Sequence, residues 1–328
     1  MIEIRIIPKP RNISITSDAL MGISELKFIS WKSPELDEAA KLCKSRFEMQ
    51  GIRLRNGGDG GRNGIILELH SELANKKGLE AYILSIGKDC IRVAGGGAAG
   101  AFYGLQTLFQ LMEDGEKLPL AEIADCPALS MRGAHFMLLG PIPRFEWFLE
   151  SIEHLASLKL NTLLLEYEDK FPYEKHGEIK HPLAFTPEQV RRIIETAKAN
   201  HISIIPLVQS LGHVEYILKH PEYAHLRERE QDPFMYCPST PESFELFKEL
   251  AGQVAEMHGD SEYLHVGADE TYFLGHCEKC RTASTFKDKA MLYIDHINRV
   301  CEFVRSLGKR PILWSDMLID FPQYIDSL

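Results

Sequence analysis

The sequence contains little that would place this protein in a membrane or on a nucleic acid. No apolar run approaches the roughly 20 residues of a membrane-spanning helix, and charged residues interrupt the first ten residues where a signal peptide would be apolar. Basic residues number 37 against 47 acidic ones, a net charge of −10, which disfavours a broad surface for nucleic acid or anionic lipid. We therefore expect a cytoplasmic protein without a nucleic-acid or membrane partner.

Cysteine patterns that would indicate a disulfide framework are also lacking. The seven cysteines are odd in number and mostly scattered, which favours a reducing compartment. One CxxC motif joins Cys277 and Cys280, but a structural zinc site needs four ligands, usually from two such pairs. Reduced surface cysteines are the favoured interpretation and a metal there is the alternative. For the functional site itself we predict no metal and no cofactor.

What the chain does contain is the apolar and charged balance of a globular protein, with 45% hydrophobic and 26% charged residues over 328 positions. Strand-like runs and a helical run at 98–112 occupy the first part of the chain. Asp125-Cys126-Pro127 then interrupts the pattern. We predict a small α/β domain over residues 1–125 and a second domain over 126–328.

The second domain alternates short apolar strands with helices. This alternation is typical of a parallel sheet, either open or closed into a (β/α)₈ barrel. About five βα strands are found before the sequence stops, against the eight of a complete barrel. The predicted strands are 130–138, 162–167, 202–208, 263–266 and 311–314, and the predicted helices are 144–158, 187–199, 241–257 and 290–307.

Polar residues follow these strands at their carboxyl ends, which is where such a barrel places its active site. The strongest signal is His265-Val266-Gly267-Ala268-Asp269-Glu270. His265 and Asp269 share one strand face, and Glu270 joins them only if the backbone turns just past Asp269. Two adjacent acids at a bend can divide the roles of proton donor and orienting base. The other candidates are Arg132, Glu166, Glu168, His213, Trp314 and Asp316.

Several of these candidates have a second interpretation. A histidine such as His213 is more often a hydrogen-bonded structural residue than a catalyst. Arg132 can clamp vicinal hydroxyls or an acid, or it can form a salt bridge at the domain boundary. Glu166 and Glu168 can bind sugar hydroxyls, or they can pair with lysines or with Arg132.

Taken together, the chain resembles the family 20 glycoside hydrolases, the β-N-acetylhexosaminidases. His265–Glu270 resembles the family's HxGxDE signature, and Met131-Arg132-Gly133 its strand-one arginine motif. Gly212-His213 is similar to the histidine after its third strand. Further likeness to the hexosaminidase D branch of the family lies in residues 165–169, 171–173, 212–215 and 220–228.

The resemblance implies a (β/α)₈ TIM-type barrel after a small α/β domain, and exo-acting removal of terminal β-linked GlcNAc or GalNAc from a glycan. It implies a substrate-assisted retaining mechanism through an oxazolinium ion. Glu270 would be the general acid and base, and Asp269 would hold the 2-acetamido N–H.

The resemblance also implies the parts that the other candidates play. Arg132 would bind the 3- and 4-hydroxyls of the terminal sugar. His213 and His265 would steer the acids, and Trp314 would wall the acetamido pocket with Asp316 nearby. Glu166 and Glu168 are further candidates for binding the substrate.

The family's later strands normally bring a tyrosine and further tryptophans and acids to the sugar, and these positions are absent from the sequence. We therefore expect the chain to be a fragment of a longer protein, with a barrel that is incomplete at its carboxyl end. One alternative is a non-catalytic relative that binds amino sugars. Another is a metal-dependent barrel hydrolase using His213, His265 and Asp269, which no HxH motif supports.

Overall fold

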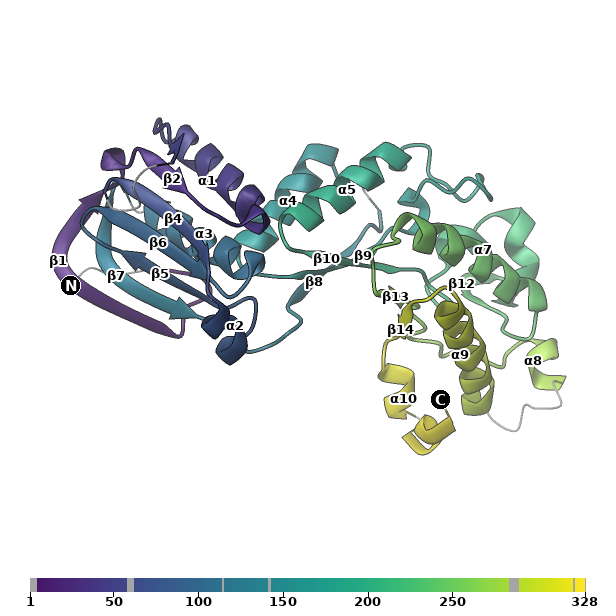
Figure 1. The fold of residues 1–328 in the computed structure, drawn as a ribbon. Coiled ribbons are helices and arrows are strands. Elements are labelled where there is room, and N and C mark those ends of the chain that lie inside the picture. Colours follow the sequence, from purple (N-terminus) through teal and green to yellow (C-terminus); the bar gives the residue numbers. More distant parts are fainter. Residues whose placement is uncertain are drawn as a thin grey trace. The chain divides into compact units, whose positions relative to one another are not determined.

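Two compact units make up the chain in the computed structural model (Figure 1). The structure describes residues 5–57, 62–113, 115–140, 143–282, 289–320 and 322–327. The N-terminal unit comprises residues 1–132, 151–161 and 199–201, and the C-terminal unit comprises 133–150, 162–198 and 202–328. Among the described residues, no helix is both long enough and apolar enough to cross a membrane.

The N-terminal unit is built on one mixed sheet in the order β1-β7-β5-β6-β4-β2-β3. β5 and β6, which are consecutive in the chain, pair as an antiparallel hairpin. The strands are β1 (Asn12–Gly22), β2 (Phe28–Ser30), β3 (Arg55–Asn56), β4 (Gly64–Leu69), β5 (Tyr82–Ile86), β6 (Cys90–Gly95) and β7 (Lys117–Asp125). The helices are α1 (Asp37–Met49), α2 (Ser71–Lys77) and α3 (Ala98–Glu113).

Helix α3 supplies much of the core of this unit. It is apolar on most of its surface, as expected of a helix enclosed by its neighbours, and it packs against β5, β6 and α1. Gly104 allows the close approach, because a Cβ there would lie 2.6 Å from the Val93 side chain. The helix predicted at 98–112 is confirmed. The predicted domain boundary coincides with the end of β7, whereas the unit defined by contacts continues to Arg132.

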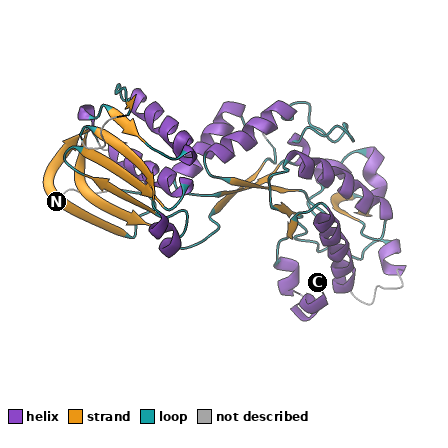
Figure 2. Cartoon of the chain, in the orientation of Figure 1, coloured by secondary structure: helices purple, strands orange, loops and turns teal. Residues whose placement is uncertain are grey.

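The C-terminal unit contains the five predicted parallel strands, in the order β14-β13-β10-β9-β8 (Figure 2). A separate antiparallel hairpin, β11–β12, follows β10 in the chain. The strands from Gly133 onwards are β8 (Gly133–Met137), β9 (Thr162–Glu166), β10 (Ser203–Leu207), β11 (Arg227–Arg229), β12 (Asp232–Tyr236), β13 (Tyr263–His265) and β14 (Arg310–Ile312). The helices are α4 (Phe145–Ser157), α5 (Pro187–Ala199), α6 (Glu215–Leu218), α7 (Pro241–Met257), α8 (Glu278–Thr282), α9 (Lys289–Ser306) and α10 (Asp316–Asp320).

The central strands of this sheet are buried on both faces, which is why they appear in the sequence as continuous apolar runs. Leu163 and Leu165 of β9 are fully buried, as is Leu264 of β13. The first and last strands differ from the prediction. β8 begins at Gly133 rather than at 130, and β14 ends at Ile312, so that Trp314 lies in the segment that follows the strand.

We expect Leu165→Ala to destabilise the C-terminal unit by about 2–5 kcal/mol, because it leaves a cavity in the packing against the buried face of β9. Leu183→Ala removes the same atoms from a side chain that is 71% exposed, and its cost should stay within about 0.5 kcal/mol. Urea unfolding of both variants measures the difference. Equal costs would show that β9 is not enclosed by its neighbours.

Candidate functional site

The candidate site lies where the parallel strands of the C-terminal unit end. The register pairs Leu207, the last residue of β10, with Glu166 of β9 on one side and His265 of β13 on the other. These three residues are the last of their strands, so the segments that follow them leave the sheet at the same edge. The alignment brings together side chains that are about 100 residues apart in the sequence.

The chain turns sharply directly after β13. Gly267, Ala268 and Glu270 have positive φ angles of 62°, 69° and 52°. A Cβ on Gly267 would lie 1.7 Å from Gln209 Oε1, so only glycine fits this position. The Gln209 amide cannot easily move aside, because its Oε1 accepts a hydrogen bond from Ala268 N–H (3.3 Å) and its Nε2 donates one to Glu166 (2.8 Å). Glu270 can join His265 and Asp269 only if the backbone turns near Asp269. The structure contains such a turn, and it begins at Gly267, two residues before Asp269.

Asp269 is mostly shielded from solvent and faces a histidine. Its Oδ2 lies 3.4 Å from His213 Nε2, and its Oδ1 is buried with no hydrogen-bond partner among the described residues. Burial acts to raise the pKa of Asp269, but the hydrogen bond from His213 and the charge of the imidazole outweigh it, and the net pKa is lowered. Asp269 is thus an ionised acceptor with one unoccupied oxygen.

Glu270 is the more exposed of the two acids, with 53% of its side chain accessible. Its Oε2 lies 3.4 Å from the same His213 Nε2. Its backbone N–H donates to Asp316 Oδ2 at 2.9 Å, which ties the turn to the first residue of α10. The adjacent acids therefore have different surroundings, one enclosed and one open.

His213 lies between the two acids, with a positive φ of 55°. Its pKa is raised, chiefly by its hydrogen bond to Asp269 and in smaller part by the charges of Glu215 and Glu270. The ring of Phe234 packs edge-on against the imidazole at 4.7 Å between centroids. Left-handed backbone at a non-glycine residue stores strain, and such residues gather at functional sites.

Aromatic rings line the same edge of the sheet. Trp314 lies 4.5 Å from His265 and 5.7 Å from His135, measured between ring centroids. Its backbone N–H donates to Gly267 O at 3.1 Å, which holds the tryptophan against the turn. Burial lowers the pKa of His265 to about 4, so this imidazole is neutral at pH 7. Its Nδ1 accepts from Gly267 N–H at 3.0 Å, which places the ring proton on Nε2.

Two buried glutamates lie at this edge, Glu166 as the last residue of β9 and Glu168 just after it. Glu166 accepts the hydrogen bond from Gln209, and its other oxygen lies 3.2 Å from His135 Nε2. Glu168 is 8% exposed and has a positive φ of 50°. Burial, followed by the charge of Glu166, raises the pKa of Glu168 to about 7.

Arg132 is not brought to this group. It directly precedes β8, at the amino end of the strand, and its Nη1 binds Glu80 at 2.8 Å. Its Nε donates to Lys159 O at 2.9 Å, and its partners all belong to the N-terminal unit. The salt-bridge interpretation of Arg132 therefore accounts for its contacts, and its predicted role in binding sugar hydroxyls is not supported.

The geometry also bears on the metal-dependent alternative. Within the described part of the chain, His213, His265 and Asp269 do not form a group with metal-ligand spacing. Such a group is made by other residues, namely Glu228, Cys237, Cys277 and Cys280.

Gln209 and His135 are important to the site but are not among the residues predicted for it. Gln209 follows the apolar strand β10, which is the signal that could have included it, whereas His135 lies within β8. Neither belongs to a motif, and their roles depend on the hydrogen bonds that each makes to Glu166, more than 30 residues away in the sequence.

We expect the pKa of His213 to fall in Asp269→Asn, because the carboxylate makes the largest contribution that raises it. The matched change Glu270→Gln should lower the pKa less, since Glu270 contributes least among the causes. An NMR titration of the imidazole signals, assigned with His213→Gln, measures both shifts. A larger effect from Glu270→Gln would contradict the pairing.

Glu168 should make the protein less stable as the pH rises. Its folded pKa of about 7 lies above its ordinary value of 4.5, so the folded state binds the proton more tightly and loses stability between these pH values. When the pH is raised from 5 to 8, the free energy of unfolding of Glu168→Gln should therefore increase relative to that of the unchanged chain by on the order of 2 kcal/mol.

Urea unfolding at both pH values measures this gain. Glu188→Gln is the control of opposite sign, because hydrogen bonding to its own backbone N–H lowers the pKa of Glu188 on the exposed start of α5. A gain that did not depend on pH would contradict the raised pKa of Glu168.

Comparison with known proteins gives the family of both parts of the chain. The family model for domain 2 of glycosyl hydrolase family 20 matches residues 3–126, and the model for its catalytic domain matches residues 144–327. Hexosaminidase D of Bos taurus is 37% identical over 200 residues, covering 59% of this chain and 57% of the relative. Hexosaminidase D of Homo sapiens is 35% identical over 198 residues, covering 59% of this chain and 41% of the relative. The chain thus spans about half the length of these relatives.

Solved structures show the same fold. A chitobiase of Flavobacterium johnsoniae superposes with a TM-score of 0.80 at 20% identity, over 95% of this chain and 52% of that one. An exo-β-N-acetylglucosaminidase of Vibrio harveyi, in complex with N-acetylglucosamine, superposes with a TM-score of 0.79 at 21% identity, over 94% of this chain and 54% of that one. The predicted fold class is confirmed: a small α/β domain precedes a parallel α/β sheet that forms part of a TIM-type barrel. The chain belongs to glycosyl hydrolase family 20.

Proposed function

We propose that this chain carries the catalytic acids of an exo-acting β-N-acetylhexosaminidase, a retaining glycoside hydrolase that removes terminal β-linked GlcNAc or GalNAc from a glycan. The match of the family's catalytic domain to residues 144–327 supports the class of reaction. The observation that carries the proposal is the unequal pair of acids after β13. Asp269 presents a buried, unoccupied oxygen, and Glu270 is open to solvent beside it.

The pair suits a reaction in which the substrate supplies its own nucleophile. Glu270 protonates the glycosidic oxygen while the 2-acetamido carbonyl oxygen attacks C1, so one C1–O bond breaks as another forms. Asp269 Oδ1 accepts the acetamido N–H and stabilises the positive charge of the resulting oxazolinium ion. Glu270 then removes a proton from water, which attacks C1 and opens the ring with retention of configuration.

His213 maintains the difference between the two acids. Its Nε2 lies equally close to both carboxylates, and the raised pKa shows that these charges favour the imidazolium form. The positive charge keeps Asp269 ionised, which its role as a hydrogen-bond acceptor requires. His213 is therefore a positioning residue in this mechanism.

The surrounding side chains form the sugar pocket in this proposal. Trp314 provides an apolar wall for the acetamido methyl group, and the neutral His265 stacks behind it. Glu168 binds a sugar hydroxyl, and Glu166 acts through the Gln209 and His135 side chains that it holds. Asp316 fixes the backbone of Glu270 with one oxygen and keeps a second, buried oxygen without a partner among the described residues.

We also propose a cytoplasmic location for the protein. The seven cysteines are all free, including several that are buried and close in space. Thiols of this kind persist in a reducing compartment.

We expect Glu270→Gln to lower kcat on a natural β-GlcNAc disaccharide by about 10²–10⁴-fold, the usual contribution of a general acid. Binding of a thiazoline or oxazoline inhibitor should remain, because Asp269 still accepts a hydrogen bond from the protonated ring nitrogen of the inhibitor. Hydrolysis assays and calorimetry measure the two effects, with the exposed Glu188→Gln as matched control. Near-normal turnover in Glu270→Gln would contradict the acid assignment.

Asp269→Asn should lose activity selectively on 2-acetamido substrates, because only these supply the internal nucleophile. The comparison uses 4-nitrophenyl β-GlcNAc and the corresponding β-glucoside at saturating concentrations, with urea unfolding as a check that the fold is retained. A small, equal loss on both substrates would exclude substrate assistance. Activity in neither the chain nor a longer form of the protein would favour the alternative of a binding protein for amino sugars.

A further inference from the structure

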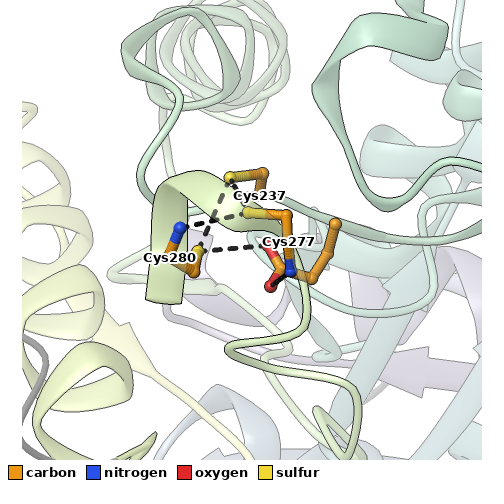
Figure 3. A group of neighbouring side chains, drawn as sticks. Cys237, Cys277 and Cys280 are labelled. Carbon is orange, nitrogen blue, oxygen red and sulfur yellow. Dashed lines mark hydrogen bonds between the residues drawn. The ribbon is translucent and has the colours of Figure 1, made fainter. Parts of the chain in front are cut away.

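Three cysteines and one glutamate from separate segments of the C-terminal unit meet at one point. Glu228 lies in β11 and Cys237 directly follows β12, whereas Cys277 directly precedes α8 and Cys280 lies within it. Figure 3 shows the three sulfur atoms turned towards one another. One ligand atom from each of the four side chains lies within 4.8 Å of all the others. This cluster is distinct from the acids of the proposed catalytic site.

The distances within the cluster fit a tetrahedral metal site. Cys237 Sγ lies 3.4 Å from Cys277 Sγ and 3.6 Å from Cys280 Sγ, and Cys280 Sγ lies 3.2 Å from Glu228 Oε2. These sulfurs are too far apart for a disulfide, whose S–S bond is about 2.05 Å. Tetrahedral zinc places two sulfurs about 3.8 Å apart, and a sulfur and an oxygen about 3.5 Å apart. Small outward shifts would therefore accommodate the ion.

The surroundings of the four side chains also favour a cation. Glu228 is 2% exposed, and Cys237 and Cys280 are equally buried. A carboxylate enclosed in this way needs positive charge or hydrogen bonds to offset its lost hydration. Glu228 Oε1 accepts from Cys277 N–H at 2.9 Å, while Oε2 faces the thiol of Cys280. A divalent ion between Oε2 and the sulfurs would supply the missing charge.

Hydrogen bonds already orient the sulfur atoms as they are oriented around a metal. The backbone N–H of Cys280 donates to Cys277 Sγ at 3.2 Å, and the hydroxyl of Ser239 lies 3.2 Å from Cys280 Sγ. Donors of this kind stabilise thiolates and set the direction in which they bind an ion.

We propose that Cys237, Cys277, Cys280 and Glu228 form a structural zinc site. Three thiolates and one carboxylate select a borderline-soft ion of tetrahedral preference over magnesium or calcium. Four protein ligands complete the coordination, so the zinc has no open position for substrate or water and serves to hold the chain.

The site would connect two segments that reach the proposed catalytic acids. The β11–β12 hairpin carries Phe234, whose ring packs on His213. The backbone carbonyl oxygen of Phe234 also accepts a hydrogen bond from Val214 N–H at 3.1 Å. Cys277 follows Glu270 by only seven residues. Zinc would therefore fix the hairpin to the segment after β13 and restrain the turn on which Asp269 and Glu270 lie.

Metal analysis of the purified chain is the first test, with elemental analysis by mass spectrometry after growth in zinc-containing medium. We expect about one zinc per chain, released when the thiols are blocked with a mercurial and detected with a chromogenic zinc indicator. Zinc-stripped chain reloaded with Co²⁺ should show sulfur-to-cobalt charge-transfer absorption of a tetrahedral site. A chain that folds, retains free thiols and takes up neither metal would overturn the proposal.

Substitutions assign the ligands. Cys280→Ser and Glu228→Gln should each reduce zinc content or affinity by at least about tenfold, whereas Cys301→Ser, at another buried cysteine, should leave it unchanged. Where a variant fails to fold, Co²⁺ titration of the unmodified chain still decides the question. Unchanged zinc in the ligand variants, or a Cys237 disulfide found by mass mapping under non-reducing conditions, would also overturn it.

Discussion

The close approach of Gly267 to the amide of Gln209 is the contact on which the candidate site depends. Only glycine fits at the point where the chain turns after β13, and the left-handed residues that follow direct Asp269 and Glu270 to the same edge of the sheet. Gln209 is itself held by Glu166, so the turn after one strand is supported by the ends of two others. Asp269 and Glu270 are thus positioned by the Gln209 amide as well as by β13, the strand that precedes them.

Burial and charge then separate the properties of the acidic groups at this edge. His213 supplies the positive charge that keeps Asp269 ionised despite its enclosure. Glu168, which is buried beside Glu166, has its pKa raised instead. The pKa of a carboxyl group at this edge is therefore lowered or raised according to whether a cation or a second carboxylate is nearest.

The strained turn also explains why the segments beyond it need support. Asp316 accepts the Glu270 N–H, Trp314 donates to Gly267 O, and Tyr293 donates to Ala268 O at 3.2 Å. Cys277 and Cys280 of the cysteine cluster lie a short way along the chain from the same turn. A zinc ion there would restrain the segment of the chain that follows this turn and leads away from the sheet.

The sequence by itself determined the alternation of strands and helices and the acid pair at 265–270. Buried parallel strands appear as apolar runs, and the residues that end them are adjacent in the sequence to the strands that position them. The tertiary structure alone decided the partner of Arg132 and the role of Gln209. It also decided that Glu228 and Cys237 join the two cysteines of the CxxC motif in the proposed zinc site. Each of these depends on a contact between side chains 40 or more residues apart, such as Arg132 with Glu80 at a separation of 52 residues. Local propensity and periodicity act over a few residues, whereas such contacts arise only when packing brings distant segments together.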